Sequence, residues 1–273
     1  MRLKSALRRG VAAAVIAGIV VSSGIPAYAK TWDIADGDIT VKGASDESGN
    51  YNEVKQGDNE FKKDEGETVI TGESDKNTVT IDTSEGNVDV TFDDLKINVS
   101  GKTEVDGSGK TEVDGSGKTE GDSSGDGSGH GGKAAVTVRG NHDATIELDG
   151  DNKLKSGSNN AGLEKNERES KGTLTIKDDN GKDGSLTAEG GDGGGDGGGA
   201  GIGGKHESGA GNIEITGGTI KAVGGEGAAG IGGGVYGPGR DIEISGGKVS
   251  ATGGDADKNL DASRPGAAGI GDG

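Results

Sequence analysis

The sequence predicts an all-β fold, a parallel β-helix (a solenoid) with three short strands in each rung and glycine-rich corners. A segment at 212–234, NIEITGGTIKAVGGEGAAGIGGG, returns from position 241 as DIEISGGKVSATGG and ends as AAGIGDG at 267–273. Repeats of this length are typical of stacked architectures. Within each copy apolar and polar residues alternate, which is the pattern of strands. The 60 glycines among 273 residues far exceed the usual share of about 7%, and they fall between the alternating runs.

Residues 1–29 have the pattern of a secretory signal peptide. Basic residues within the first nine positions precede an apolar run at 11–21, and Ala-Tyr-Ala at 27–29 is a small-x-small cleavage signal. The apolar run is shorter than the roughly 20 residues of a membrane-spanning helix. The sequence therefore predicts a secreted, extracellular or cell-surface protein without membrane insertion after signal cleavage.

Composition narrows the classes of function. The formal net charge is −18, and loss of the basic leader would make the chain more acidic still, so we expect no binding to nucleic acid. An acidic polymer could bind to such a chain only through bridging cations. The chain has no cysteine, so disulfides do not hold it together. Aromatic residues make up 2% of the chain, which favours a thin, elongated core over a thick globular one.

The chain divides into a cap region and a repeat region. We predict an N-terminal cap at 30–66, where Trp32 covers the open apolar end of the stack, because terminal repeats are atypical. Strands start at 67 and run through to 273. They are interrupted at 101–132, where GKTEVDGS occurs twice and then decays. This insert lacks an apolar face, so we predict a low-complexity disordered loop.

Three strands recur in each copy, and each contributes an apolar pair at i and i+2 that points to one side. We align the first-strand pairs as Ile146/Leu148, Leu174/Ile176, Ile213/Ile215 and Ile242/Ile244. We align the second-strand pairs as Leu186/Ala188, Ile220/Ala222 and Val249/Ala251, with Leu154 as a looser match. We align the third-strand pairs as Ala161/Leu163, Ala200/Ile202, Ala229/Ile231 and Ala268/Ile270.

Glycines have two predicted roles. Pairs such as Gly217-Gly218 and Gly246-Gly247 stand where the strands must turn, and glycine takes a positive φ there without a Cβ penalty. Glycines such as Gly201 and Gly230 alternate with the apolar residues of the third strand. They predict an outward strip without side chains, on which a flat polymer could lie or another backbone could pack.

The repeats and several N-terminal segments, among them TWDIADGDITV and NVDVTFDDLKI, resemble a group of secreted bacterial proteins. Members of this group are labelled carbohydrate-binding domain-containing. The resemblance covers most of 31–273 outside the insert and rests on scaffold residues. It implies a right-handed parallel β-helix similar to pectate lyases. It also implies binding of cell-wall or plant-type polysaccharide, with Ca²⁺ in some relatives.

Outward positions of the first strand supply the candidate ligand-binding residues. Glu147, Glu214 and Glu243 occupy them, and neighbouring strands lie about 4.8 Å apart, so Glu214 and Glu243 would be adjacent carboxylates. Lys221 projects outward from the next strand and would relieve their repulsion. These residues predict a Ca²⁺ or uronic-acid site, and a solvated charged face is the alternative.

The run GGDGGGDGGG at 190–199 is a second candidate metal site, with Asp192 and Asp196 as ligands. It matches the calcium-binding nonapeptide frame only in part, because alternating apolar residues are missing. No cofactor is required by the sequence as a whole.

We expect a protein that is not an enzyme, because no nucleophile, base and acid stand at a recognisable spacing. The leading hypothesis is therefore non-catalytic polysaccharide binding. A structural surface spacer or adhesin without a specific ligand is the alternative, and a polysaccharide lyase or hydrolase is the second alternative. Unpaired strand edges at the end of the stack also predict end-to-end self-association.

Overall fold

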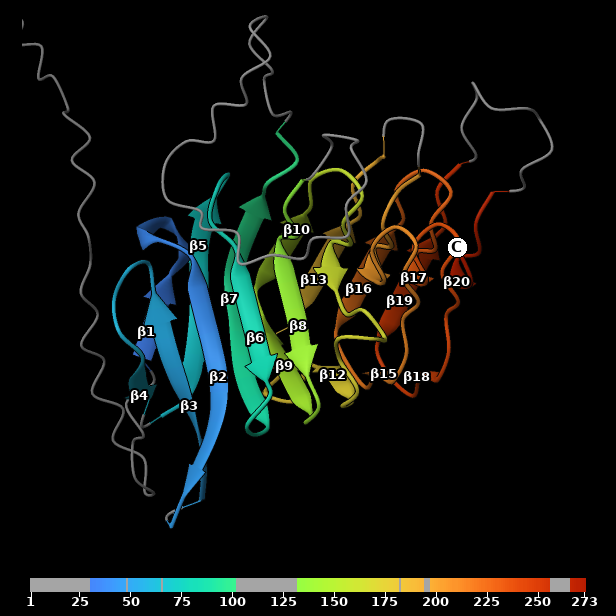
Figure 1. The fold of residues 1–273 in the computed structure, drawn as a ribbon. Helices are drawn as coiled ribbons and strands as arrows, with labels where there is room; N and C mark the ends of the chain where they lie inside the picture. The colour runs from blue at the N-terminus through green and yellow to red at the C-terminus, as the bar shows by residue number, and fades with distance from the viewer. Residues whose placement is uncertain are drawn as a thin grey trace, which may run out of the picture.

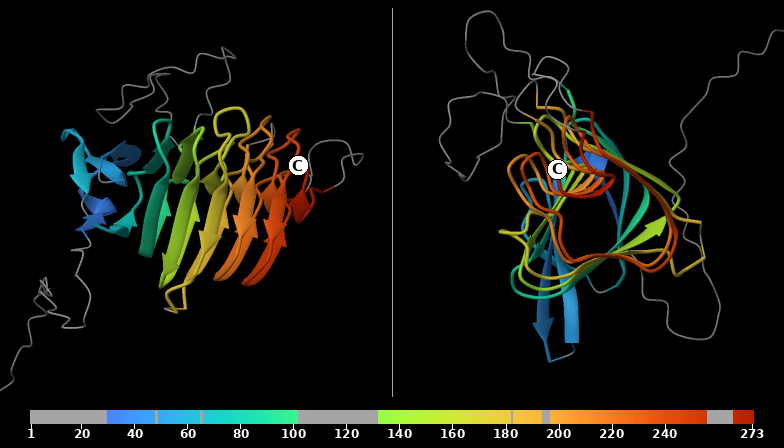
Figure 2. Two further views of the ribbon diagram at one scale, coloured as in Figure 1. Left: turned by 90° about the horizontal axis from the view of Figure 1, so that it is seen from below. Right: turned by 90° about the vertical axis from the view of Figure 1, so that its right-hand side faces the viewer.

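The computed structural model describes residues 30–101, 132–255 and 266–273, apart from residues 48, 65, 182 and 194–196. The predicted signal peptide and nearly all of the predicted insert lie outside the described residues. Within them the fold is all-β, with one 3-10 turn, η1 (Ile34–Asp36), and no α-helix. From residue 68 onwards the strands follow one another along the molecule in sequence order and curl around a shared interior (Figure 1; Figure 2, right).

The strands of the described residues form two sheets, one of eleven strands and one of nine. The eleven-stranded sheet contains β1 (Lys30–Asp33), β5 (Thr68–Ser74), β7 (Val88–Asn98), β9 (Ala144–Asp149), β10 (Asp151–Lys155), β12 (Leu174–Lys177), β13 (Ser185–Glu189), β15 (Ile213–Ile215), β16 (Thr219–Val223), β18 (Ile242–Ile244) and β19 (Lys248–Thr252). The nine-stranded sheet contains β2 (Ile39–Asp46), β3 (Gly49–Gln56), β4 (Lys62–Asp64), β6 (Val79–Thr83), β8 (Val136–Gly140), β11 (Leu163–Glu164), β14 (Ile202–Gly203), β17 (Ile231–Gly232) and β20 (Ile270–Gly271).

The larger sheet has two arms that meet at the long strand β7. The first half of β7 pairs with β9, and its last residues pair with β10. One arm continues through β12, β15 and β18, and the other continues through β13, β16 and β19. All of these pairings are parallel. Each pass of the chain therefore adds one strand to each arm and one strand to the smaller sheet.

The smaller sheet is parallel from β2 to β20, whereas β2, β3 and β4 pair antiparallel at its other edge. Trp32 on β1 is 7% exposed, and its Nε1 donates to Asp64 Oδ2 at 2.9 Å. Lys30 lies over the ring, with Nζ 3.6 Å from the centroid. Trp32 thus packs into this end of the molecule, and its ring is not a free platform for a ligand.

Aliphatic residues form continuous rows inside the molecule. Cα partners in the smaller sheet align Leu163, Ile202, Ile231 and Ile270 as the third-strand pairs predicted. The row extends back through Val136, Val79 and Ile39. The second-strand pairs also align as predicted. Because these side chains stack on like side chains, a narrow core is filled by only 28% hydrophobic residues.

The predicted alignment of the first strand is wrong at one step. Leu174 pairs with Ala144, and Ile176 pairs with Ile146, so the β9 pair that we assigned as Ile146/Leu148 is displaced by two residues. A slip of two residues keeps every side chain on the same face of a strand. Alternation alone therefore did not fix this register.

The glycine pairs do not act mainly through positive φ, contrary to the sequence prediction. Gly218 and Gly247 have φ of +82° and +77°, but most members of the pairs do not have a positive φ. They are instead required by close approach of backbone. A Cβ on Gly191 would meet Gly157 O at 2.0 Å, and a Cβ on Gly225 would meet Gly191 O at 2.3 Å.

The predicted outward glycine strip is also wrong, because those glycines are buried. A Cβ on Gly201 would meet Val223 N at 2.5 Å, and a Cβ on Gly230 would meet Thr252 N at 2.6 Å. The third strand therefore packs directly on the backbone that leaves the second strand. No polymer can reach this strip.

Candidate functional site

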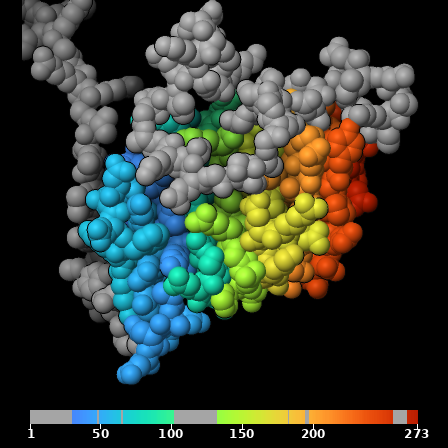
Figure 3. All heavy atoms as spheres, in the orientation of Figure 1, coloured from blue at the N-terminus to red at the C-terminus, as the bar shows by residue number. Residues whose placement is uncertain are grey.

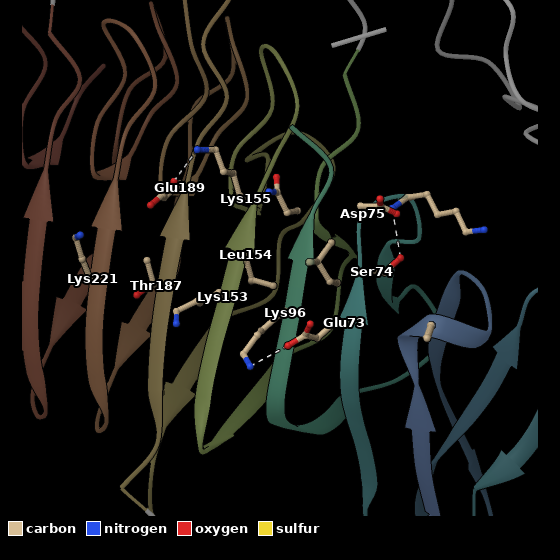
Figure 4. Close-up of a pocket in the computed structure, with 14 residues that line it drawn as sticks. Glu73, Ser74, Asp75, Lys96, Lys153, Leu154, Lys155, Thr187, Glu189 and Lys221 are labelled. Carbon is tan, nitrogen blue, oxygen red and sulfur yellow. Dashed lines mark hydrogen bonds and ion pairs between the residues drawn. The ribbon is translucent and has the colours of Figure 1, made fainter. Parts of the chain in front are cut away.

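One candidate site is a groove of about 760 Å³ on the outer face of the second arm. We call it the lysine groove (Figure 4). Five lysines and three carboxylate residues line it, together with smaller and apolar groups. Its lining residues are Ala35, Glu73, Ser74, Asp75, Lys76, Lys96, Ile97, Asn98, Lys153, Leu154, Lys155, Thr187, Glu189 and Lys221.

Parallel register places the lysines in a row that crosses the strands. Lys96 on β7 is the Cα partner of Lys153 on β10, which in turn pairs with Thr187 on β13. Thr187 pairs with Lys221 on β16. Neighbouring strands lie about 4.8 Å apart. The row therefore runs along the long axis of the molecule, and Figure 4 shows these side chains in that order.

Carboxylates hold three of the lysines in place. Lys96 Nζ lies 3.0 Å from Glu73 Oε1, and Lys155 Nζ lies 3.1 Å from Glu189 Oε2. Lys153 Nζ lies 2.6 Å from Asp151 Oδ2, and this hydrogen bond lowers the pKa of Asp151. The hydrogen bond that Lys96 Nζ donates to Glu73 raises the pKa of Lys96. These pairs offset the repulsion between Lys96 and Lys153 on adjacent strands.

Lys76 and Lys221 differ from the other groove lysines. Neither ammonium group forms an ion pair within the described part of the chain. Lys221 is exposed, and its row neighbours Thr187 and Ser250 are uncharged. The groove thus offers two ammonium groups without an ion pair, against one lining carboxylate, Asp75, that also forms none. On a chain whose net charge is −18, this local excess of positive charge favours an anion.

Of the predicted ligand-binding residues, Glu214 and Glu243 do lie side by side. They are Cα partners on β15 and β18, and the row continues through Thr175 and Thr145. Lys221 does not relieve this acidic pair as we expected. It belongs to the other arm, lines the lysine groove, and makes no ion pair with either glutamate among the described residues.

Glu147 lies outside the Glu214–Glu243 row because of the two-residue register shift. Its Cα partner is Lys177 on β12, and its Oε2 lies 3.1 Å from Lys177 Nζ. Its Oε1 accepts from the backbone amides of Asp179 and Asn180, at 2.8 and 3.1 Å. Glu147 therefore anchors the turn after β12, and both of its oxygens are occupied.

Those predicted metal ligands that the structure describes are not gathered into a centre of three or more. Asp192 Oδ1 accepts from the Glu226 amide at 3.0 Å, which ties two successive loops together. Asp196 lies outside the described residues. Among the described residues, no group of three or more His, Asp or Glu side chains could hold a metal ion.

A second groove, of about 640 Å³, lies between β3 and the outer face of the first arm. We call it the acid–amide groove because asparagines and carboxylates dominate its lining. Its lining residues are Asn50, Tyr51, Asn52, Gly66, Glu67, Asn87, Asp89, Val90, Thr91, Thr145, Glu147, Lys177, Asp179 and Asn180. Figure 3 shows the described residues following one another in space from the N-terminal part, in blue, to the C-terminal end, in red.

Neither groove was predicted from the sequence. Lys153 and Lys155 flank the inward-pointing Leu154, so the sequence alone indicates that both lysines point outward. Their neighbour Lys96 lies on the far side of the 101–132 insert, which hid the match between copies. Asn52 and Asp89 come from segments without a common repeat.

Comparison with protein-family models, with curated proteins and with solved structures finds no match for this chain. The grooves and their side chains therefore carry the functional argument alone. Within the described residues, no helix has the length and apolar character needed to cross a membrane.

Proposed function

We propose that the chain is a secreted or cell-surface, non-catalytic polysaccharide-binding protein. In this proposal the two arms and the smaller sheet are the three sides of a right-handed parallel β-helix. The N-terminal segment at 30–66 caps it, and the lysine groove is the binding site. The ligand class is an anionic polysaccharide of the uronic-acid type.

The row of lysines across successive strands carries this proposal. A linear polymer has charges at repeated intervals, and the parallel register places Lys96, Lys153 and Lys221 along the long axis at multiples of the strand spacing, with Thr187 between the last two. A groove open along that axis accommodates a chain rather than a compact metabolite. Lys76 and Lys221 supply charge for the ligand, whereas the paired lysines supply hydrogen-bond donors in fixed positions.

Direct contact with lysines makes Ca²⁺ unnecessary in this proposal. The alternative is a cation bridge at Glu214 and Glu243, whose carboxylates are adjacent and which have no partner among the described residues. The two modes predict opposite effects of a chelator. The lysine groove binds equally well in Ca²⁺ and in EDTA, whereas the bridge fails in EDTA.

The test is isothermal titration of polygalacturonate and of a neutral glucan, each in Ca²⁺ and in EDTA. We expect binding of the uronic polymer alone, weakened about fivefold by Lys221→Ala because an exposed charge contributes up to about 1 kcal/mol. Lys248→Ala is the matched control, because Lys248 is exposed on the neighbouring β19 but does not line the groove.

Three outcomes would replace the proposal. Absence of binding to every polymer, with and without Ca²⁺, leaves a structural spacer or adhesin. Binding that requires Ca²⁺ and is lost in the Glu214→Ala/Glu243→Ala variant moves the site to the acidic pair. Release of unsaturated uronates, detected by ultraviolet absorbance, makes the protein a lyase.

A further inference from the structure

The acid–amide groove is lined by a largely buried asparagine whose amide oxygen receives no hydrogen bond from the described residues. Asn52 is 8% exposed and lines the groove. Its Nδ2 donates to Thr68 Oγ1 at 2.9 Å and to the Asp89 carbonyl oxygen at 2.6 Å. A carbonyl oxygen only accepts, so the amide nitrogen must point that way and the orientation of the side chain is fixed.

The Asn52 Oδ1 atom is therefore the polar atom of this groove-lining side chain that remains available as an acceptor. None of the described residues donates a hydrogen bond to it, and it is not sealed from solvent. A largely buried polar side chain normally finds partners for all of its polar atoms. A ligand that donates a hydrogen bond to Asn52 Oδ1 would give every polar atom of this side chain a partner.

The other groups in reach are also acceptors. Asp89 is exposed, and its carboxylate forms no hydrogen bond or ion pair within the described part of the chain. One carboxylate oxygen of Glu67 accepts a hydrogen bond from Thr91 Oγ1 at 2.5 Å, and its other oxygen accepts none from the described residues. The one lysine in the lining, Lys177, is already bound to Glu147 and Asp179. The lining therefore carries net negative charge, and Lys63, which lies over the lining residue Tyr51, is itself paired with Asp46.

The rim supplies groups suited to hydroxyls and to a ring. Asn50 has no partner within the described residues, and Asn87 keeps a free Nδ2 because only its Oδ1 is used, by the Asp143 amide. Thr145, the Cα partner of Asp89, adds a hydroxyl that both donates and accepts. Tyr51 adds an aromatic ring, one face of which is covered by Lys63, with Nζ 4.0 Å from the ring centroid.

We propose that the acid–amide groove binds a hydroxyl-rich ring that carries a protonated amine, the chemistry of an amino-sugar unit. The ammonium lies against Asp89 and donates to Asn52 Oδ1. The hydroxyls bond to Asn50, Asn87 and Thr145. This site is separate from the lysine groove and has the opposite charge preference, so one chain would hold two chemically different glycans.

The test compares three oligomers of equal length, made of glucosamine, N-acetylglucosamine and glucose. Binding is measured by isothermal titration at low salt and at a slightly acidic pH, where the free amine is protonated. We expect the glucosamine oligomer to bind at least tenfold more tightly than the other two. Acetylation removes the charge and blocks the donor while it keeps the ring, so it isolates the amine.

Two variants separate a site from general attraction to an acidic protein. Asp89→Asn keeps the shape and the backbone carbonyl that holds Asn52, and it should weaken glucosamine binding about fivefold. Glu243→Gln removes the same charge from the same outward row but outside the groove, and it should change nothing.

Equal weakening in Asp89→Asn and Glu243→Gln would overturn the proposal, as would equal affinity for the acetylated oligomer or no binding of the glucosamine oligomer. Lys221→Ala separates this test from the one on the lysine groove. It should leave glucosamine binding unchanged while it weakens binding of polygalacturonate. Failure of either proposal is thus visible independently of the other.

Discussion

Gly225→Ala tests whether glycine is required for contact between successive passes of the chain. Gly225 is buried, and an added Cβ would lie 2.3 Å from Gly191 O and 2.8 Å from Gly191 C. The same contact recurs in the series, because a Cβ on Gly254 would lie 1.9 Å from Gly225 O. Each glycine therefore leaves room for the carbonyl of the previous pass.

The magnitude follows from the displacement that the methyl group would force. A tolerable Cβ–oxygen contact is about an ångström longer, so backbone on one side must move by that amount. Overpacking of this kind costs about 1–3 kcal/mol. Alanine recovers about 0.4–1 kcal/mol by restricting the unfolded chain. We expect a net loss of about 1–2 kcal/mol, which lowers the thermal midpoint by about 2–8 °C for a chain of this size.

Gly211→Ala is the matched control for this measurement. Gly211 is also buried, but a Cβ there would meet its nearest atom, Arg240 O, at the ordinary distance of 3.4 Å. This variant should keep its stability or gain up to about 1 kcal/mol. The assay is thermal and urea unfolding followed by circular dichroism. Equal midpoints for Gly225→Ala and Gly211→Ala would refute the close-approach explanation.

Three further predictions concern buried polar groups and the exposed end. Asn152→Leu should lower the free energy of unfolding, measured in urea, by about 3 kcal/mol. The reason is that the fully buried Asn152 side chain accepts a hydrogen bond from Leu95 N and donates to Asp149 O and Ser185 O; unchanged stability would contradict this. Burial lowers the pKa of Lys165 to about 8. Between about pH 8 and 10 the lysine is therefore protonated in the unfolded chain but not in the folded one, so the free energy of unfolding should rise with pH, by at most about 1.4 kcal/mol per pH unit. Lys165→Met should flatten that rise, and a flat wild-type profile would argue against it. Ile244 and Ile270, 38% and 47% exposed, should support end-to-end association seen by light scattering, which Ile244→Asp/Ile270→Asp abolishes; association that persists in the variant would place the contact elsewhere.

The sequence was a good guide to the interior wherever copies are nearly identical. The alignment of Ile202, Ile231 and Ile270 follows from one repeated sequence motif, and the register of the hydrogen-bonded strands confirms it. The earlier Ile146 step failed because an alternating strand can slide by two residues without exposing an apolar side chain. The alternation of apolar and polar residues therefore predicts which face of a strand is buried more securely than it predicts how neighbouring strands are aligned.

The cause of the glycine requirement could not be read from sequence. Positive φ and close backbone approach both select glycine, and only the positions of neighbouring carbonyls distinguish Gly218 from Gly225. The grooves escaped prediction for a related reason. Lys96 and Lys153 are Cα partners although the insert separates them in sequence, and Asn52 reaches Asp89 only through the fold.

Lysine footprinting tests the central claim most directly. Exposed lysines are acetylated with and without polygalacturonate, in EDTA, and the modified sites are quantified by mass spectrometry. The lysine groove predicts that Lys76 and Lys221 become protected by the polymer, while Lys248 on the adjacent strand reacts as before. Equal protection of all three lysines, or protection of none of them, would contradict binding in this groove.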